Sequence, residues 1–466
     1  MATRPTSATF PDDSEQSPQS APIPPGQIKR AFDLVVWDGF CSQGFIAIVA
    51  GVFLFDFALR LGADNVTIGL LAALPPLAQL LQLPSVPLVE RLGARRAICL
   101  WTATPARAAL LLVAAAPYLA SGAGAVSVIV AGIALFAALH APSNCAWGSW
   151  MRDLIPPERV PALFARRIAV MTAFGAVVVW AAGWWVDHWQ SGHPDRAELA
   201  YPPLFVFAAL IGFAGMAVLA RIPEPAMTPP VTHERLGARL AAPLRDPNYR
   251  RLIVFLGIWG FAVNLVIPFF TVYMLTRLGY DPGRVAWLAV LGQVANFLSL
   301  KLWGRLIETH SAKSALRLGA PVFVATIPAF ALAGYPASHE LTLPLIALLH
   351  VVQGATLGGI ALASLTLTLR LAPAERATGF IAFNTLVGSL GAGLAPILAG
   401  AFLDELTAWT ARLGALPIGR WEALFALAFL ISLLALRRLG PIAEAGDTGP
   451  LETLRRLPVW RRPERR

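Results

Sequence analysis

Charged residues are scarce in this chain of 466 residues. Asp, Glu, Lys and Arg make up 14% of it, whereas soluble domains carry roughly 25%. Apolar residues reach 56%, and a soluble core of this size could not bury so much apolar surface and keep a wettable exterior. The composition therefore excludes a soluble globular protein and indicates a chain that folds in lipid.

Metal-binding and catalytic motifs are also missing. The three cysteines, Cys41, Cys99 and Cys145, fall in or beside apolar runs without CxxC or Cys/His spacing, which argues against a disulfide framework or a zinc site. The chain has no Walker phosphate loop, HExxH or GxSxG. We expect no catalytic residue, metal or cofactor. The net charge is +10, but the arginines cluster between apolar runs, so no nucleic-acid partner is expected.

Long apolar runs fill most of the chain. A spanning helix needs ~20 mostly apolar residues to cross a hydrocarbon core of ~30 Å. The first six runs cover 34–59, 66–88, 97–119, 124–150, 164–188 and 202–220, and the second six cover 252–276, 284–306, 314–335, 341–370, 378–404 and 418–438. The sequence thus predicts an all-α membrane protein with twelve transmembrane helices in the lipid bilayer.

Polar segments divide the chain into two halves. Residues 1–27 lack the apolar region of a signal peptide, and the longest polar interval between apolar runs lies at 222–251. We expect a disordered tail at 1–30, a six-helix bundle at 31–221, a linker at 222–250, a second bundle at 251–439 and a basic tail at 440–466. Most Lys and Arg residues fall in the tails and even-numbered loops. Both termini and the linker should therefore be cytoplasmic, in a plasma or inner membrane.

The two halves repeat each other at an offset of 217 residues. The Arg-Leu-Gly of 60–62 returns at 277–279, the Pro-x-Glu-Arg of 156–159 returns at 373–376, and the Ala-Gly ahead of Asp187 returns ahead of Asp404. Duplicated halves that share a midplane cavity are typical of secondary transporters. The alternative is that any membrane bundle reuses Gly and Arg at its helix ends.

The loop after the second run carries a family resemblance. Residues 86–96 read Val-Pro-Leu-Val-Glu-Arg-Leu-Gly-Ala-Arg-Arg, which resembles the Gly-x-Leu-Ala-Asp-Arg-x-Gly-Arg-Arg loop of the major facilitator superfamily (MFS). A weaker copy, Gly-Arg-Leu-Ile-Glu-Thr-His-Ser-Ala-Lys, occupies 304–313. Val86, Glu90 and Ser311 depart from the family pattern. The resemblance implies two pseudo-symmetric six-helix bundles and transport by alternating access. It also implies a cavity lined by spans 1, 4, 7 and 10.

The acids in these loops suggest a cytoplasmic latch between the halves. A carboxylate at a helix end can bind the positive N-terminus of another helix, so we expect Glu90 to contact the start of span 11 and Glu308 the start of span 5. Simple positive-inside topology with incidental acids is the alternative. The candidate gate residues are Glu90, Arg91, Gly93, Arg95, Arg96, Glu158, Arg159, Gly304, Glu308, Glu375 and Arg376.

Polar residues inside the spans are candidates for a substrate cavity, because ionisable groups are costly in the bilayer. Asp38 is a candidate proton carrier, or a helix-end acid that pairs with Lys29 or Arg30. Arg107 is either a receptor for an anionic substrate or a structural residue. Interhelical hydrogen bonding is the alternative for the neutral residues. The candidates for substrate binding or proton coupling are Asp38, Gln43, His140, Asn144, Asn264, His350 and Gln353.

These observations together predict a secondary active transporter. We expect a small organic solute as substrate, a proton or solute gradient as the driving force, and a functional monomer, since one chain holds a complete pathway. Two other classes stay open. One is a non-transporting assembly factor or receptor with this fold, and the other is an integral membrane enzyme.

Overall fold

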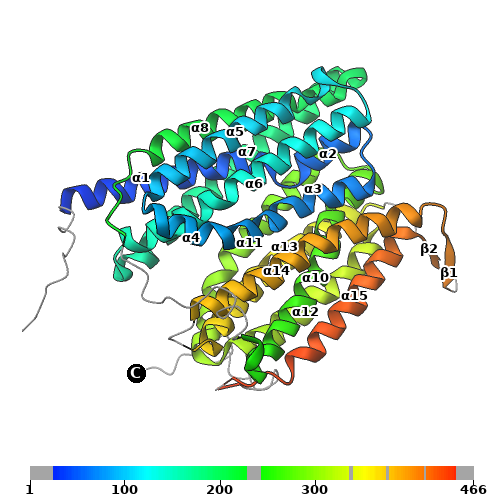
Figure 1. The fold of residues 1–466 in the computed structure, drawn as a ribbon. Helices are drawn as coiled ribbons and strands as arrows, with labels where there is room; N and C mark the ends of the chain where they lie inside the picture. Colours follow the sequence, from blue (N-terminus) through cyan, green and yellow to red (C-terminus); the bar gives the residue numbers. More distant parts are fainter. Residues whose placement is uncertain are drawn as a thin grey trace, which may run out of the picture.

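The computed structural model describes residues 25–227, 243–334, 339–373, 377–413, 416–444 and 446–447. Two helical bundles lie side by side (Figure 1). The first, the N-half, contains α1 (Pro25–Val49), α2 (Val52–Arg60), α3 (Asn65–Ala78), α4 (Gln82–Leu92), α5 (Arg95–Leu119), α6 (Ala123–Leu154), α7 (Val160–Gly192) and α8 (Pro202–Leu219). The second, the C-half, contains α10 (Pro247–Thr276), α11 (Pro282–Thr309), α12 (Ala312–Ala333), α13 (Thr342–Leu371), α14 (Ala377–Glu405) and α15 (Arg420–Leu439).

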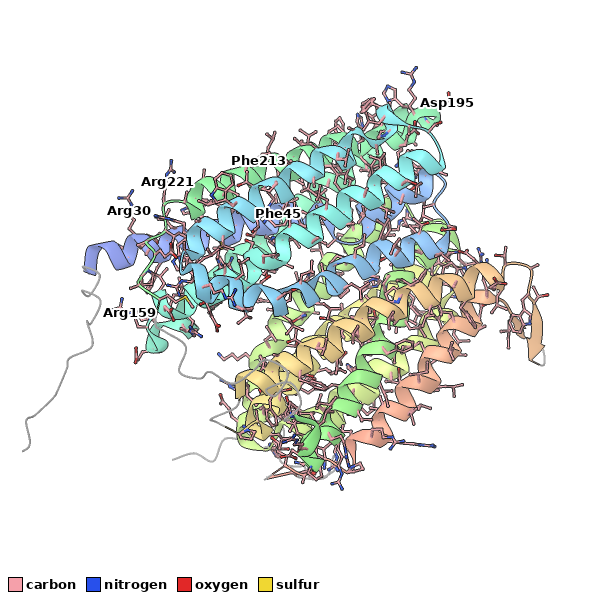
Figure 2. All side chains as sticks on the ribbon, viewed as in Figure 1. Arg30, Phe45, Arg159, Asp195, Phe213 and Arg221 are labelled. Carbon is pink, nitrogen blue, oxygen red and sulfur yellow. The ribbon has the colours of Figure 1, made fainter. Side chains whose placement is uncertain are left out.

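A small hairpin of β1 (Ala411–Leu413) and β2 (Leu416–Ile418) joins α14 to α15. It marks one end of the molecule, which we call the hairpin end. The opposite end, where α1 begins and α15 finishes, is the terminus end (Figure 1). Figure 2 places Arg30, Arg159 and Arg221 at the terminus end and Asp195 at the hairpin end. These labelled charges follow the asymmetry that the sequence predicts.

Eleven helical segments in the described part of the chain are long and apolar enough to cross a membrane. The helix α15 is not among them, because it carries Arg420 and Glu422 in its first turn and Arg437 and Arg438 in its last. It nevertheless packs along α10 and α12 and completes the C-half. The predicted all-α fold with two six-helix bundles is therefore confirmed.

Two predicted spans are broken where the apolar pattern runs on. The run 34–59 divides into α1 and α2 at Gly51, which has a φ of 90°, a conformation that favours glycine. The run 66–88 divides into α3 and α4 at a short 3₁₀ turn, Gln79–Leu81. Hydropathy alone does not register these breaks, because lipid or neighbouring helices accept either geometry. The first break adjoins the cavity described below.

At the hairpin end, the start of α3 is capped from both halves. Within the N-half, Asp64 accepts a hydrogen bond from the backbone N–H of Thr67 at 2.8 Å. Hydrogen bonds at Thr67 hold the pKa of Asp64 below its usual value. From the C-half, Asp404 accepts from the side chain of Asn65 at 2.5 Å and from the backbone N–H of Val66 at 3.0 Å. A carboxylate is stabilised there by the positive end of the helix.

The repeat partner of this contact joins the halves a second time. Asp187, near the end of α7, accepts a hydrogen bond from the backbone N–H of Gly283 at the start of α11, at 3.0 Å. The backbones approach closely here, because a Cβ on Gly183 would lie 2.8 Å from the Cα of Gly283. We call these two sites, Asp404 of α14 at the start of α3 and Asp187 of α7 at the start of α11, the hairpin-end contacts. Towards the terminus end, the start of α14 diverges from α4 (Figure 1).

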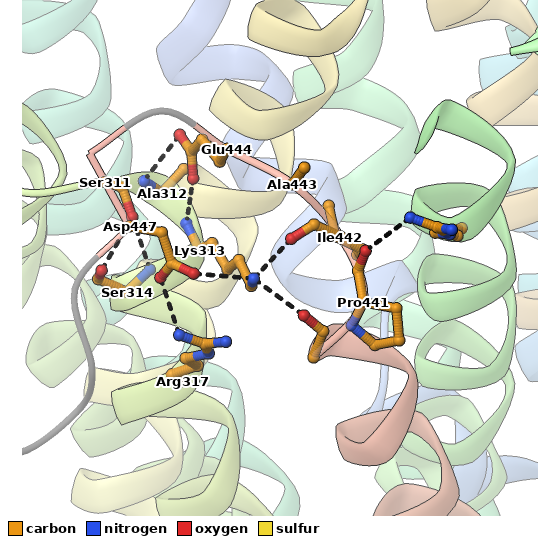
Figure 3. Close-up of polar contacts among 12 residues, drawn as sticks. Ser311, Ala312, Lys313, Ser314, Arg317, Pro441, Ile442, Ala443, Glu444 and Asp447 are labelled. Carbon is orange, nitrogen blue, oxygen red and sulfur yellow. Dashed lines mark hydrogen bonds and ion pairs between the residues drawn. The ribbon is translucent and has the colours of Figure 1, made fainter. Parts of the chain in front are cut away.

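Within each half, a short segment after the last helix folds back at the terminus end. Glu224 accepts from the backbone N–H of Arg95, at the start of α5, at 2.6 Å. In the C-half, Glu444 accepts from the backbone N–H of Lys313, at the start of α12, at 2.7 Å, and Asp447 pairs with the Lys313 ammonium at 2.8 Å (Figure 3). The segments that begin the expected linker and the expected tail are thus attached to their own bundles.

The first helix also begins earlier than the sequence suggests. Helix α1 starts at Pro25, inside the segment 1–30 that the composition assigns to a disordered tail. Residues 1–24 and 448–466 lie outside the described part of the chain, as does most of the linker, 228–242.

Candidate functional site

An ion pair lies inside the N-half, between α1 and α7. Asp38 is 4% exposed, and its Oδ2 lies 2.9 Å from Nη2 of Arg167. The Arg167 Nε donates to the carbonyl oxygen of Val35 at 3.2 Å, and its guanidinium lies 4.6 Å from the ring centroid of Trp147. The partner of Asp38 is therefore Arg167, and neither Lys29 nor Arg30 pairs with it. Sequence reasoning missed this residue, although Arg167 falls inside the predicted span 164–188.

A second arginine lies deeper in the same bundle and has no acidic partner. Arg107, on α5, is 1% exposed, and its Nη1 lies 3.2 Å from Nδ1 of His140 on α6. Its guanidinium lies over the ring of Phe45, 3.9 Å from the centroid, and 5.4 Å from the centroid of Phe136. Among the described residues no carboxylate lies within ion-pair distance of Arg107, and its Nε has no hydrogen-bond partner.

Glycines create the space for both guanidinium groups. A Cβ on Gly212 of α8 would lie 2.6 Å from Cδ of Arg107, and a Cβ on Gly39 of α1 would lie 2.6 Å from Nε of Arg167. A contact below 3.0 Å forces the neighbour to move. The small residues therefore allow the long polar side chains to pass between tightly packed helices. The two glycines and the two arginines lie on four different helices, α1, α5, α7 and α8, so the packing of these helices defines the site.

The two arginines line a cavity of about 190 Å³, which we call the polar pocket. Phe45, labelled in Figure 2, is part of its wall within the first bundle. The polar side chains in the lining are Asp38, Ser42, Arg107, His140, Ser143, Asn144, Trp147 and Arg167. The pocket thus brings together three of the predicted candidates, Asp38, His140 and Asn144.

A second cavity, of about 180 Å³, lies between the halves. We call it the central cavity. Its walls come from α1, α2 and α7 of the N-half and from α11 of the C-half. Gln43, Thr172 and Gln293 are the polar residues of the lining, which contains no charged side chain. Ile46 borders both the central cavity and the polar pocket. The predicted candidate Gln43 therefore faces the space that the two halves share.

The candidates of the C-half lie in neither cavity. The Asn264 side chain donates to the carbonyl oxygen of Gly260 at 2.8 Å, His350 Nδ1 lies 2.8 Å from the carbonyl oxygen of Ile346, and Gln353 donates to Thr326 at 3.0 Å. All three side chains thus find hydrogen-bond partners within their own bundle. Polar residues that stabilise a bundle have such contacts.

The candidate gate residues do not join the halves in this structure. Glu90 and Glu308 are exposed, and neither has a hydrogen bond or ion pair in the part of the chain that is described. Arg91, Gly93, Arg96, Glu158 and Arg159 are also exposed, and Gly304 is half-buried. Glu375 and Arg376 lie outside the described residues. The latch therefore stays a prediction.

Arg95 differs from the other gate candidates, because it is fully buried within the N-half. Its Nη1 pairs with Asp153 at the end of α6, its Nη2 donates to the carbonyl oxygen of Pro225 at 2.6 Å, and Glu224 binds its backbone N–H. In this conformation Arg95 fastens the segment after α8 to its own bundle. It has no hydrogen bond or ion pair with the described part of the C-half here.

Comparison with known proteins supports the same architecture. The sequence matches the family model described as Major Facilitator Superfamily over residues 39–340 and 252–459. A search of curated protein sequences finds no match. The family match covers both halves, including the polar pocket and the central cavity.

Several solved structures share this fold at low sequence identity. A point mutant of the nucleoside transporter NupG superposes with a TM-score of 0.71 at 12% identity, covering 90% of this chain and 100% of the other. A D-xylose-proton symporter gives 0.65 at 13%, with 91% and 100% covered. The inward-open xylose transporter XylE from E. coli gives 0.65 at 12%, with 92% and 99% covered. At such identities the likeness shows the fold alone.

Proposed function

Because the chain belongs to the major facilitator superfamily, we propose that it is a secondary active transporter that moves a small organic solute by alternating access. The observation that carries this proposal is the central cavity between two halves that are joined at one end. The hairpin-end contacts close the molecule on one side, while the helices diverge on the other (Figure 1). A cavity at the junction of two rigid bundles is where a rocking carrier exposes its substrate.

The orientation belongs to the same proposal. The hairpin end faces outward, and the termini lie in the cytoplasm of a cell with this protein in its plasma or inner membrane. The clustered arginines at the terminus end support this assignment. The described conformation is then open to the cytoplasm, and the hairpin-end contacts must break before the cavity opens outward.

The cytoplasmic latch completes the cycle. In the outward-open state, Glu90 and Glu308 would bind helix N-termini of the opposite half, as Asp187 and Asp404 do at the hairpin end. The chain already uses this contact between its halves twice, which supports its use at the other end. The two sets of carboxylates would be engaged alternately.

We assign the driving force to a proton gradient, with Asp38 as the carrier. Its carboxylate is buried, it borders the polar pocket, and Arg167 can hold it in the charged state. One of the structures with this fold is a D-xylose-proton symporter, which supports proton coupling as a mechanism for this architecture.

Reconstitution of the purified chain into proteoliposomes tests the proposal. A solute that raises the apparent melting temperature of the protein is loaded on one side, and its counterflow is measured with and without an imposed pH gradient. A transporter moves the solute in both settings and concentrates it when the gradient is present. Binding without any flux would instead identify a receptor or assembly factor.

Asp38→Asn separates transport from coupling. We expect counterflow to persist and accumulation driven by the pH gradient to disappear, because the carboxamide cannot bind the transported proton. Asp33→Asn is the matched control, since Asp33 lies about one and a half turns earlier on α1 and is paired with Arg166 at the surface. Accumulation that survives in Asp38→Asn would exclude Asp38 as the carrier.

A further inference from the structure

Two arginines border the polar pocket, but only one of them is neutralised. Asp38 lies 2.9 Å from Arg167 and offsets its charge. Arg107 has no acidic partner in the described part of the chain, although it is 1% exposed. A buried charge inside a membrane bundle is costly unless it is paired. The pocket therefore carries one uncompensated positive charge.

The neutral contacts of Arg107 do not remove this deficit. His140 offers one ring nitrogen at 3.2 Å, and the face of Phe45 offers a cation–π contact at 3.9 Å. A guanidinium has five N–H donors, and its Nε donor is left without a partner among the described residues. Both neutral contacts leave the formal charge of the pocket unchanged.

The unpaired donor of Arg107 belongs to this pocket. Four buried side-chain nitrogens lack a hydrogen-bond partner in the part of the chain that is described, and one of them is Nε of Arg107, which lines the pocket. A guanidinium N–H can only donate. One unpaired donor and one excess positive charge are the complement of an anionic acceptor.

The pocket has room for such a group. Its volume of about 190 Å³ corresponds to about six water molecules, at about 30 Å³ each. A carboxylate or a phosphate fits within that volume, but a larger solute must extend beyond it. Ile46 lines both this pocket and the central cavity, whose lining contains no charged side chain.

We propose that the transported solute is an organic anion, whose anionic group is bound by Arg107 in the polar pocket and whose uncharged body lies in the central cavity. This inference rests on the proposed transport function and adds the substrate class to it. Arg107 is the binding residue, and Gly212 positions it by leaving space for its side chain. Arg107 and Arg167 together outweigh the single carboxylate of Asp38, so the lining stays positive whether or not Asp38 carries a proton.

A matched set of probes tests the substrate class. Benzoate, phenyl phosphate and benzenesulfonate share an aromatic body with the neutral benzamide and the cationic benzylammonium. Each is added at one concentration and fixed pH to the purified full-length protein in detergent, and the melting temperature is measured. We expect a rise with at least one anion and none with benzamide or benzylammonium. The proposal is overturned if benzamide stabilises the protein as much as the anions do. It is also overturned if none of the anions stabilises it.

Two substitutions assign the binding to Arg107. Arg107→Gln should weaken binding of the effective anion by at least about tenfold, because truncating one partner of a buried charge pair has effects of that size or larger. Arg107→Lys is the second variant, in case Arg107→Gln does not fold. It keeps the positive charge and should keep part of the affinity. Arg166→Gln is the control, since Arg166 lies at the surface next to Arg167 and pairs with Asp33. Equal affinity in Arg107→Gln and the wild type would refute the assignment.

The effective anion then enters the proteoliposome assay. If it binds but is not transported, the anion site stands and the transport function fails. If instead the stabilising solutes that cross the membrane are neutral, transport stands and the organic-anion class fails. The two proposals therefore fail on different readouts.

Discussion

The two halves of this molecule share a backbone plan but differ in their interiors. At the repeat offset of 217, Asp38 corresponds to Phe255, Arg107 to Val324, His140 to Leu357 and Arg167 to Asn384. Phe255 and Val324 are buried in the apolar core. The charged groups of the polar pocket are therefore particular to the N-half, while the C-half fills the same places mostly with hydrocarbon.

Positions at the ends of the helices behave differently, because they are alike in both halves. Asp187 and Asp404 each cap a helix of the opposite half, and Glu224 and Glu444 each cap a helix of their own half. In the rocking cycle that we propose, contacts between the bundles such as those of Asp187 and Asp404 serve both halves alike. The recognition of one solute needs only a single pocket, so its residues are free to differ between the repeats.

The largest expected difference between the halves follows from removing a charge. Arg167→Leu leaves Asp38 buried without its partner and should cost about 3–5 kcal/mol of stability. The matched change in the C-half, Asn384→Leu, removes a hydrogen bond of 3.3 Å to Thr368 and should cost about 0.5–1.5 kcal/mol. Thermal unfolding in detergent measures both. Equal losses would show that the ion pair contributes no more than a neutral contact.

The double variant Asp38→Asn with Arg167→Leu refines that measurement. It removes both charges, so we expect part of the stability lost in Arg167→Leu to return. No recovery would mean that the loss comes from the packing of the Arg167 stem beside Gly39 and of its guanidinium on Trp147, and not from the unpaired carboxylate.

A smaller effect is expected from filling the space beside Arg107. In Gly212→Ala the new Cβ would lie 2.6 Å from Cδ of Arg107, so the side chain must shift, at about 1–3 kcal/mol. Gly148→Ala on α6 is the control, because a Cβ there meets no atom within 4 Å. Stability and anion affinity should both fall in the first variant and not in the second. Unchanged anion affinity in Gly212→Ala would separate Arg107 from binding.

The helices of this fold could be predicted from the sequence, because peptide groups in hydrocarbon must be satisfied within each segment. The apolar run 97–119 becomes α5 at Arg95–Leu119, and the run 418–438 becomes α15 at Arg420–Leu439. The breaks at Gly51 and at Gln79–Leu81 could not be read from hydropathy. They change the path of the backbone without changing how apolar the segment is.

The site was predictable only in part. The cost of a buried carboxylate makes Asp38 a candidate from the sequence, and the structure places it in the polar pocket. Its partner Arg167 lies on α7, and only the packing of α1 against α7 brings the two together. Arg107 is also a charged residue inside a predicted span, and the sequence left two interpretations of it open, a receptor for an anionic substrate and a structural residue. The missing acid and the unpaired Nε became visible only once the described neighbours of its guanidinium were known.

The smallest expected effect concerns the contacts that both halves share. Replacing Asp187 and Asp404 together by Ala removes a carboxylate from the N-termini of α11 and α3. Such contacts contribute about 0.3–1 kcal/mol each, so the double variant should shift the balance towards outward opening by up to about thirtyfold. Labelling of a cysteine introduced at Thr172, in the central cavity, by an impermeant reagent from outside measures that shift.

Asp195→Ala, at the same end of the molecule (Figure 2), is the control. Unchanged outside labelling in the double variant would mean that packing of the glycine-lined helices, and not the carboxylates, keeps the hairpin end closed.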